Sequence, residues 1–379
     1  MPPAADRPAV LVYRDMLLPR SEVAFMRRQY AAFATLRPLW IGRKLAPDLD
    51  RAAFPLAAAF TGPAGLAFKT LGLVPNLAHL RTLGATVVHA QFGRGGALAL
   101  PLAERLGLPL VVTFHGGDVS KSAHYRPFAL LRRRLPRLAA YASAFVCVSE
   151  GVRSLLIARG FPAAKAVVVP IGTDTLAEPP RQGPGDGILF VGRFVEMKGA
   201  EILLEAIAQL RAQGVDAPVT LIGDGPNAQA LRARAPLAVT FAGWQPEQAV
   251  RAAMRQARLV VIPSVRARSG EAEGLPSVAT EAMGMAVPVV ASEAAGTAGL
   301  IAPGHNGLIV PERDPTALAV ALRHLLENPD AAQRMGAAAR ATVAEGFDAT
   351  AQSRKLERLL RAAAAAGPAT PLDFAHVLG

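Results

Sequence analysis

Cysteine is almost absent from this chain of 379 residues, in which Cys147 is the only one. A single cysteine excludes any disulfide within the chain and favours a reducing compartment. Cys147 lies in the apolar run Phe145-Val146-Cys147-Val148, which predicts a buried strand residue rather than a reactive thiol. Aromatic residues make up only 6% of the sequence, and no zinc-finger, RNA-recognition or helix-turn-helix signature is present, which argues against a nucleic-acid-binding protein.

Long hydrophobic runs are missing as well. No segment offers the roughly 18 consecutive uncharged apolar residues that a membrane-spanning helix requires. Residues 1–7 lack the basic flank and the long apolar core of a secretory signal. We therefore expect a cytoplasmic protein that does not span a membrane.

Acidic residues are scarce in the first half of the chain. Residues 1–180 hold 22 Lys and Arg against 10 Asp and Glu, whereas residues 181–379 hold 19 of each. The whole formal net charge of +12 therefore comes from the N-terminal half, a distribution that indicates a polyanionic partner. A composition biased toward Arg and Ala would give the same excess without any partner.

What the sequence does contain is enough apolar material for two domains. Hydrophobic residues make up 51% of it, and the chain is longer than a single core usually organises. Short apolar runs alternate with longer helical patterns, which predicts an α/β fold with two doubly wound, Rossmann-like parallel sheets. The expected strands are Ala9–Tyr13, Thr86–Ala90, Leu110–Phe114, Phe145–Val148 and Ala166–Pro170, then Gly187–Val191, Val219–Ile222, Val239–Ala242, Leu259–Ile262 and Val287–Ala291.

A stretch rich in Pro and Gly, residues 178–186, separates the two sets of strands and predicts a linker. We expect an N-terminal domain over residues 1–178 and a C-terminal domain over residues 187–348. Residues 349–379 would form a helix and tail that pack back toward the N-terminal domain. Doubly wound sheets bind ligands at the carboxyl ends of their strands, so we expect a cleft between the two domains.

The most specific motif runs from Glu273 to Glu281 and reads EGLPSVATE. Gly-Leu-Pro between a strand and a helix places Glu273 in a loop and Glu281 inside the helix, roughly 10–12 Å apart. That separation exceeds the roughly 5–9.5 Å of a glycosidase pair and suits the two ends of an extended ligand. Backbone amides between the two glutamates would form a phosphate site at a helix N-terminus, and they belong to Gly274, Leu275, Ser277 and Val278.

Two basic residues, Arg193 and Lys198, follow the first expected strand of the C-terminal domain. Their cationic side chains suit a diphosphate, and Gly192 at the strand end lets the backbone approach a ligand.

In the N-terminal domain, an apolar strand runs into the polar segment His115-Gly116-Gly117-Asp118. We interpret His115 as a functional residue at the ligand-binding edge of the sheet, although a lone histidine can also be a satisfied structural group. His89 occupies a similar strand end, and its pattern favours neither alternative.

Together, in this order, these motifs resemble those of retaining glycosyltransferases with two Rossmann-like domains, the GT-B fold, and within them glycosyltransferase family 4. The resemblance spans residues 10–360 and is strongest to enzymes of bacterial exopolysaccharide and colanic-acid-type assembly. The segments that carry it are Pro19–Glu22, Thr113–Asp118, Val148–Glu150, Pro170–Asp174, Val191–Arg193 with Lys198–Gly199, Pro263–Ser264, and Glu273–Glu281.

The resemblance implies a retaining, metal-independent hexosyltransferase that needs no cofactor. Residues 1–178 would form its acceptor-side domain and residues 187–348 its nucleotide-sugar-binding domain. The donor would be a UDP- or GDP-sugar, and the acceptor a saccharide or a polyprenyl-diphosphate-linked saccharide in cell-surface polysaccharide synthesis. The leaving diphosphate would help to deprotonate the acceptor on the same face of the sugar, so no protein nucleophile is required. The enzyme would lie peripherally on the inner face of the cell membrane.

Site roles follow from the same resemblance. His115 would line the sugar pocket and Glu273 would contact the transferred sugar, and we take these two as the catalytic residues. Arg193 and Lys198 would bind the diphosphate, and Glu281 the ribose hydroxyls. The remaining donor-site positions are Gly192, Gly274, Leu275, Pro276 and Ser277, and the acceptor-side candidates are Ser21, Glu22 and Asp118.

Two positions depart from the family pattern. Relatives often read Gly-x-Pro-Glu where this chain has Gly296-Thr297-Ala298-Gly299, and Ser-Glu-Thr-Phe where it has Ser21-Glu22-Val23-Ala24-Phe25. The first change removes a carboxylate that would otherwise be expected at the donor site.

The basic N-terminal half suggests docking on anionic lipid. Arginines concentrate in residues 132–137 and at Arg14, Arg20, Arg27 and Arg28. Two apolar stretches, Phe54–Phe60 and Leu66–Leu73, are too short to cross a bilayer but could lie at its surface.

Two other classes of enzyme are alternatives to consider from the sequence. A sugar-nucleotide epimerase can share the fold and the donor site, and it would release an altered nucleotide sugar without an acceptor. A metal-dependent transferase would need an Asp-x-Asp pair after a strand, but Asp48-Leu49-Asp50 follows a basic, polar segment, so we expect no metal there.

Overall fold

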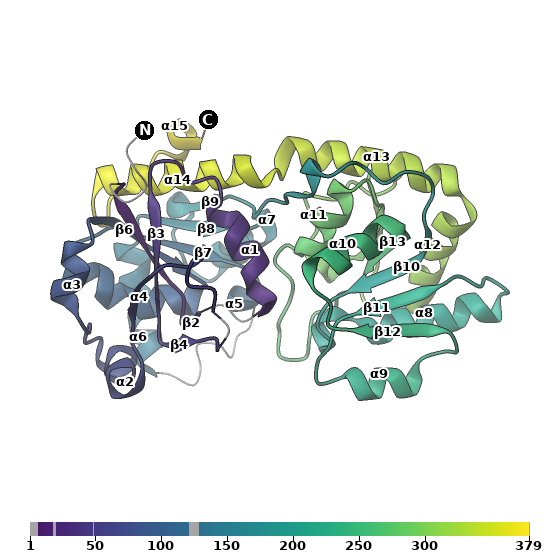
Figure 1. The fold of residues 1–379 in the computed structure, drawn as a ribbon, viewed down its shortest axis with the longest axis horizontal. Coiled ribbons are helices and arrows are strands. Elements are labelled where there is room, and N and C mark those ends of the chain that lie inside the picture. Colours follow the sequence, from purple (N-terminus) through teal and green to yellow (C-terminus); the bar gives the residue numbers. More distant parts are fainter. Residues whose placement is uncertain (1–6, 18–19, 48, 121–128, 379) are drawn as a thin grey trace. The chain divides into compact units, whose positions relative to one another are not determined.

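The computed structural model describes residues 7–17, 20–47, 49–120 and 129–378, apart from the side chains of residues 20–22, 129–132 and 295. The chain divides into two compact units (Figure 1). Unit 1 consists of Met1–Ile171 and Ala349–Gly379, and unit 2 of Gly172–Asp348.

Unit 1 is built on a seven-stranded sheet in which all neighbouring strands are parallel. Across the sheet the order is β5 (Leu56–Ala59), β3 (Arg37–Gly42), β1 (Ala9–Tyr13), β6 (Ala85–Gln91), β7 (Leu110–Phe114), β8 (Ala144–Cys147) and β9 (Ala166–Val168). Chain order therefore reverses between β1 and β6, which is where a doubly wound sheet binds its ligand. A small separate sheet pairs β2 (Met16–Leu17) with β4 (Lys44–Leu45).

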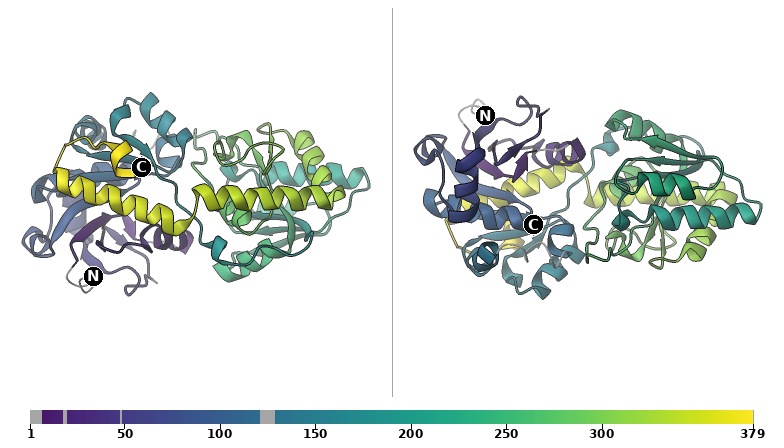
Figure 2. Two further views of the ribbon diagram at one scale, coloured as in Figure 1. Left: turned by 90° about the horizontal axis from the view of Figure 1, so that it is seen from above. Right: turned by 90° about the horizontal axis from the view of Figure 1, so that it is seen from below.

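Helices cover both faces of the unit 1 sheet. On one face lie α1 (Arg20–Tyr30) and α14 (Ala349–Ala366), and on the other lie α4 (Gly93–Leu106) and α6 (Ala129–Tyr141) (Figures 1 and 2). Leucines of α14, including Leu356 and Leu360, join Val10 and Val87 of the sheet in one buried cluster. The last long helix of the chain is therefore part of the core of unit 1.

Unit 2 contains a six-stranded parallel sheet. Its order is β12 (Val239–Gly243), β11 (Val219–Ile222), β10 (Asp186–Val191), β13 (Ala257–Ile262), β14 (Val289–Ser292) and β15 (Leu308–Val310). Chain order reverses between β10 and β13. One face packs against α8 (Ala200–Ala212) and α12 (Pro315–Glu327), and the other against α10 (Glu247–Gln256), α11 (Ser277–Gly284) and α13 (Pro329–Gly346).

The prediction of two doubly wound parallel sheets is confirmed, and each of the ten expected strands overlaps a strand of these sheets. Cys147 is buried in β8, and burial raises the pKa of its thiol to about 12, as suits an inert core residue. Strands β3, β5 and β15 of these two sheets were not predicted from the sequence, nor were β2 and β4 of the small sheet. Of these, β3 begins with Arg-Pro and β15 has three residues, so neither carries a strong strand pattern.

The predicted linker lies inside unit 2 instead of between the units, because the chain leaves unit 1 already at Ile171. Asp174 and Glu178 each pair with Arg251 of α10 at 2.6 Å. Arg181 is buried and donates a hydrogen bond of 2.7 Å to the carbonyl of Ala257. These contacts hold a segment rich in Pro and Gly against the second sheet.

Candidate functional site

In unit 2, the predicted donor residues follow the two strands between which the chain order reverses. The short 3-10 helix η5 (Glu196–Lys198) comes after β10, and the loop with Ser264 and Glu273 comes after β13. Because both strands are parallel, their carboxyl ends meet at one edge of the sheet. This edge is the usual ligand-binding edge of an open α/β sheet.

Lys198 and Glu273 form an ion pair at this edge. The hydroxyl of Ser264 donates a second hydrogen bond to the same carboxylate oxygen at 3.3 Å. The side chains of Lys198 and Glu273 are 18% and 9% exposed, so the pair is largely shielded from water. Two predicted site residues, 75 positions apart in the chain, are therefore in direct contact.

Two glycines with positive φ let backbone segments approach closely here. A Cβ at Gly199 (φ +66°) would lie 1.8 Å from the carbonyl oxygen of Pro263, and one at Gly296 (φ +70°) would lie 2.6 Å from that of Gly274. Neither position can accept a side chain without displacing the loop beside Glu273 or the end of β13. The close approach of the backbone therefore requires a glycine at position 296. The fourth residue of this segment is Gly299, where the family pattern has a glutamate.

Helix α11 supplies the remaining donor candidates of unit 2. It begins at Ser277 directly after Pro276, and in the described part of the chain no side chain caps its first amides. Such an uncapped N-terminus carries a partial positive charge. Glu281 lies in the second turn with its side chain partly buried, and its backbone carbonyl accepts a hydrogen bond of 3.1 Å from the Thr175 hydroxyl. Arg193 is exposed in the loop after β10.

In unit 1, His115 follows β7, two strands from β1 across the sheet. Its Nε2 atom lies 2.8 Å from Oε1 of Gln91, and its ring lies 4.3 Å from the ring of Phe92, centroid to centroid. Burial, with smaller contributions from Arg14 and His89, lowers the pKa of His115 to about 3. The imidazole is therefore neutral at physiological pH and can donate through one nitrogen and accept through the other.

Asp118 anchors the loop that carries His115. Its buried carboxylate accepts hydrogen bonds of 2.8–3.0 Å from the backbone N–H groups of Gly93, His115 and Gly116. Burial raises the pKa of Asp118, while these hydrogen bonds act in the opposite direction. Since internal donors occupy the carboxylate, we interpret Asp118 as a residue that fixes the loops after β6 and β7 rather than one that contacts the acceptor.

Comparisons with known proteins match both units. The profile described as "Glycosyltransferase Family 4" matches residues 35–176, and that described as "Glycosyl transferases group 1" matches residues 185–328. The amylovoran biosynthesis glycosyltransferase AmsK of Erwinia amylovora is 31% identical over 300 residues, which cover 75% of this chain and 72% of that protein. This chain belongs to glycosyltransferase family 4. The members of this family are retaining hexosyltransferases.

Further comparisons support the assignment to this family. The glycosyltransferase WcaL of Salmonella typhimurium, named for colanic acid biosynthesis, is 31% identical over 294 residues, 73% of this chain and 70% of that one. Among solved structures, Anabaena HepE in complex with UDP-glucose matches with a TM-score of 0.73 and 20% identity, over 93% and 99% of the two chains. Sucrose-phosphate synthase from Thermosynechococcus elongatus matches with a TM-score of 0.74 and 20% identity, over 94% and 98%. The GT-B fold expected from the sequence is confirmed.

Ser21 and Glu22, the acceptor-side candidates of the glycosyltransferase, lie in the first turn of α1, and their side chains are outside the described residues. Asp48 of the Asp-x-Asp sequence is outside them too. Among the residues that the structure describes, no group of three or more His, Cys, Asp or Glu side chains could hold a metal ion. Within the same ranges, every helix is too short or too polar to traverse a lipid bilayer.

Next to His115 lies a buried polar cluster that was not predicted from the sequence. Gln91, Gln29 and Tyr30 are each at most 7% exposed and are joined by hydrogen bonds to one another and to both His89 and His115. The signal was present in the sequence, because His89 and Gln91 are alternate residues of an otherwise apolar strand and so share one face of the sheet. His89 uses both ring nitrogens in this cluster, which identifies it as a satisfied internal group.

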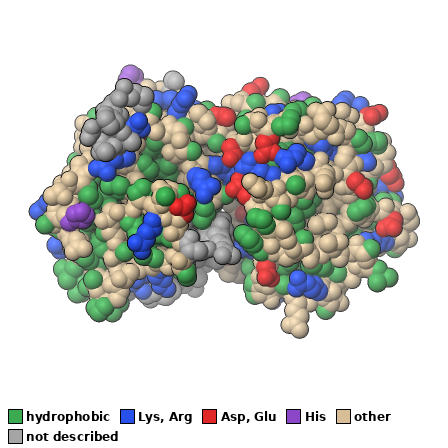
Figure 3. Space-filling view, in the orientation of Figure 1, with side chains coloured by type: hydrophobic (Ala, Val, Ile, Leu, Met, Phe, Trp, Pro, Cys, Tyr) green, Lys and Arg blue, Asp and Glu red, His purple; other side chains and the backbone are tan. Residues whose placement is uncertain are grey.

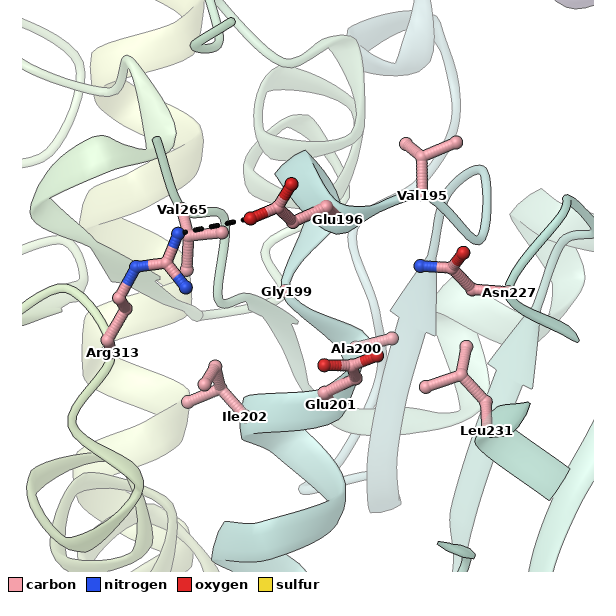
Figure 4. A pocket seen from close by; sticks show the side chains of 10 residues that line it. All are labelled: Val195, Glu196, Gly199, Ala200, Glu201, Ile202, Asn227, Leu231, Val265 and Arg313. Atoms are coloured by element: carbon pink, nitrogen blue, oxygen red, sulfur yellow. Dashed lines mark ion pairs between the residues drawn. The ribbon is translucent and has the colours of Figure 1, made fainter. Parts of the chain in front are cut away.

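A shallow pocket in unit 2 lies at the N-terminus of α8 (Figure 4). Its lining includes the carboxylates of Glu196 and Glu201, and Glu196 pairs with Arg313 at 3.5 Å. Two carboxylates oppose the binding of a diphosphate. None of the residues labelled in Figure 4 belongs to the predicted donor set, and we assign no donor role to this pocket.

The basic residues of unit 1 separate into buried and exposed groups. Arg28 and Arg134 are 6% and 7% exposed, and Arg134 donates hydrogen bonds to the carbonyls of Ala97 and Thr70. In the apolar stretch Phe54–Phe60, both phenylalanines are buried, whereas Pro55 and Ala59 are exposed. The side chains of Arg28, Arg134 and the two phenylalanines are therefore not available at the surface for membrane contact.

Other candidates for a membrane surface are exposed. Leu66, Leu71 and Leu73 lie in or just after α2 (Gly62–Leu71) and are 47–70% exposed, and Arg133 on α6 is exposed as well. On the face drawn in Figure 3, Lys and Arg side chains lie among hydrophobic ones over unit 1, and most of the visible acidic side chains lie over unit 2.

Proposed function

We propose that this glycosyltransferase moves a hexose from a UDP- or GDP-sugar to a saccharide or lipid-linked saccharide during the synthesis of a cell-surface polysaccharide. The observation that carries the proposal is the contact between Lys198 and Glu273 next to the start of α11. It joins a cation suited to a diphosphate with a carboxylate suited to sugar hydroxyls. Relatives named for colanic acid and amylovoran biosynthesis support the polysaccharide context.

In this proposal, Lys198 and Arg193 bind the two phosphates of the donor. The backbone amides of Gly274, Leu275, Ser277 and Val278 add the positive end of α11, and Gly192 leaves the end of β10 free of a side chain. Glu281 accepts hydrogen bonds from the ribose, and Glu273 accepts them from the transferred sugar. Charge-assisted bonds of this kind are shorter and about twice as strong as neutral ones, which favours an extended anionic ligand.

The reaction would proceed without a protein nucleophile. As the bond between the anomeric carbon and the diphosphate breaks, negative charge grows on the leaving oxygen, where Lys198, Arg193 and the α11 amides stabilise it. The acceptor hydroxyl attacks from the same face, and its proton passes to the leaving diphosphate. The new glycosidic bond then has the configuration of the donor. Neutral His115 holds a hydroxyl of the sugar during this step.

For the acceptor, we propose that unit 1 docks reversibly on the inner face of the cell membrane and receives a polyprenyl-diphosphate-linked saccharide. The support is the exposed leucine group on α2 together with exposed basic residues of the same unit. Apolar side chains that enter the interface and basic residues attracted to anionic lipid each contribute to such binding.

A melting-temperature screen tests the donor part. A ligand that binds only the native state at 100 times its Kd raises the stability by about 2.7 kcal/mol. We expect UDP- or GDP-sugars to raise the melting temperature and, with a suitable acceptor, to release the free nucleoside diphosphate. No shift with any nucleotide sugar would contradict the proposal. An altered nucleotide sugar formed without an acceptor would instead indicate an epimerase.

A further inference from the structure

A continuous series of hydrogen bonds connects the interior of unit 1 with His115. The amide nitrogen of Gln91 donates to Oε1 of Gln29 at 2.9 Å and to the Tyr30 hydroxyl at 2.5 Å. The Tyr30 hydroxyl lies 2.8 Å from Nδ1 of His89, whose Nε2 lies 2.7 Å from the hydroxyl of Thr113. At the other end, Oε1 of Gln91 lies 2.8 Å from Nε2 of His115.

Counting donors assigns the protons of this series. A carboxamide nitrogen has two hydrogens, and Gln91 uses both of them on Gln29 and Tyr30, so its oxygen can only accept from His115. Nε2 of His115 must then carry a proton. Burial raises the pKa of Tyr30, so its hydroxyl keeps its hydrogen and donates it to His89. The donor and the acceptor are therefore assigned in each of these hydrogen bonds.

We infer that Gln91 is a positioning residue that holds His115 as the Nε2–H tautomer and leaves Nδ1 as a hydrogen-bond acceptor for a hydroxyl of the substrate. In the described part of the chain, Nδ1 has no hydrogen-bond partner, and the side chain of His115 is only partly buried. The substrate role rests on the proposed function, whereas the tautomer is a property of the protein by itself. Gln91 is fully buried and acts only through His115.

Aromatic rings fix the plane of the imidazole while Gln91 fixes its proton. The Phe92 ring lies 4.3 Å from the His115 ring at an interplanar angle of 36°, and Phe25 lies 5.6 Å away. Phe92 has φ +67°, a strained conformation that is uncommon for a residue with a side chain. Strain at the residue directly after Gln91 supports a functional requirement for this arrangement.

Long-range proton–nitrogen NMR of the ligand-free protein tests the tautomer, with His115→Ala used to assign the signals. We expect Nε2–H in the wild type. In Gln91→Met, which has a similar shape without the amide oxygen, the Nδ1–H form should become populated. Thr113→Val is the matched control, because it breaks the far end of the series and should leave His115 unchanged. An Nδ1–H tautomer in the wild type, or an unchanged spectrum in Gln91→Met, would overturn the inference.

Turnover of the donor found in the melting-temperature screen tests the substrate role. Gln91→Met should lower kcat/KM about tenfold, as expected for one hydrogen bond, while Thr113→Val should stay within about threefold of the wild type. Equal losses in both variants, in step with their melting temperatures, would show that the cluster only stabilises the fold. If no nucleotide sugar is turned over, the proposed function fails and the NMR result still decides the tautomer.

Discussion

The carboxylate of Glu357 accepts hydrogen bonds from both the backbone N–H and the hydroxyl of Thr35, at 2.6 and 2.9 Å, although the two residues are 322 positions apart. The amides of Ala34 and Leu36 donate to the same carboxylate at 2.8–3.0 Å. One side chain of α14 thus satisfies three consecutive backbone donors in the segment between α1 and β3. This contact ties the end of the chain to the beginning of unit 1.

Replacing Glu357 by Gln should destabilise unit 1. Hydrogen bonds to a charged group contribute about 1.5–3 kcal/mol, and the uncharged amide of glutamine would accept them more weakly. Urea unfolding at pH 7 should show a loss of this size. The exposed Glu345 of α13 provides a control, since Glu345→Gln should change the free energy of unfolding by less than about 0.5 kcal/mol.

The same variant should reveal a pH dependence. Burial raises the pKa of Glu357, but the hydrogen bonds from Ala34, Thr35 and Leu36 outweigh it, so the pKa is lowered overall. A lowered pKa in the folded state stabilises the protein above the unfolded-state pKa of about 4.3, and this contribution disappears as the pH falls through the folded-state value. The unfolding free energies of wild type and Glu357→Gln should therefore converge below about pH 4. A constant difference down to pH 3 would contradict this account.

At the donor site, Glu281→Ala and Arg193→Ala should each weaken donor binding by roughly ten- to a hundredfold while leaving the fold intact, because each removes a charge-assisted hydrogen bond. Donor titration and steady-state kinetics would measure the loss. Glu205→Ala on the exposed side of α8 is the control and should leave donor binding unchanged. Wild-type kinetics in either site variant would argue against the donor assignment.

Chelation should not abolish activity. Two basic side chains and the amides of α11 can neutralise the leaving diphosphate without a metal ion. We expect turnover in EDTA to stay within about twofold of the untreated enzyme, an effect well below 1 kcal/mol. Complete loss in EDTA, followed by recovery with Mn²⁺ or Mg²⁺, would show that a metal takes part.

Membrane docking should depend on both apolar and basic side chains of unit 1. Co-sedimentation with anionic vesicles should weaken as salt rises and fall in the double variant Leu71→Ser with Arg133→Ser, since each basic residue near the surface contributes about 1 kcal/mol. Arg134 is unsuitable for this test because it is buried. The exposed Arg334 of unit 2 serves as the control, and Arg334→Ser should not change binding. Equal binding to neutral and anionic vesicles, or none to either, would refute the proposal.

The sequence predicted those features that short segments determine. Apolar runs such as Leu110–Phe114 are buried on both faces of a parallel sheet, so their identity as strands is visible without tertiary information. The sequence Gly-Leu-Pro likewise predicted the loop after β13 and the start of α11. What could not be predicted depends on distant contacts. Arg134 and Arg193 look alike in the sequence, and only the packing of α6 against α2 and α4 buries the first.

The packing of residues 178–186, which were predicted to be a linker, also depends on distant contacts. Pro and Gly indicate a segment without regular structure, but they do not say what that segment packs against. The packing of this segment is determined by Arg181 and Arg251, through hydrogen bonds and ion pairs that join residues 73–77 positions apart. The alternation in β6 indicates that Gln91 shares a face with His89, but two of its hydrogen-bond partners lie on α1, an element far from it in the chain.

Because α14 completes the core of unit 1, the two units cannot finish folding in the order in which a ribosome makes them. Unit 2 is one continuous stretch and has all its residues once position 348 has been synthesised. Unit 1 must wait for Leu356, Leu359 and Leu360, and until then the sheet surface that they cover stays open to solvent. During synthesis the first half of the chain is therefore the half most exposed to aggregation and most in need of a chaperone.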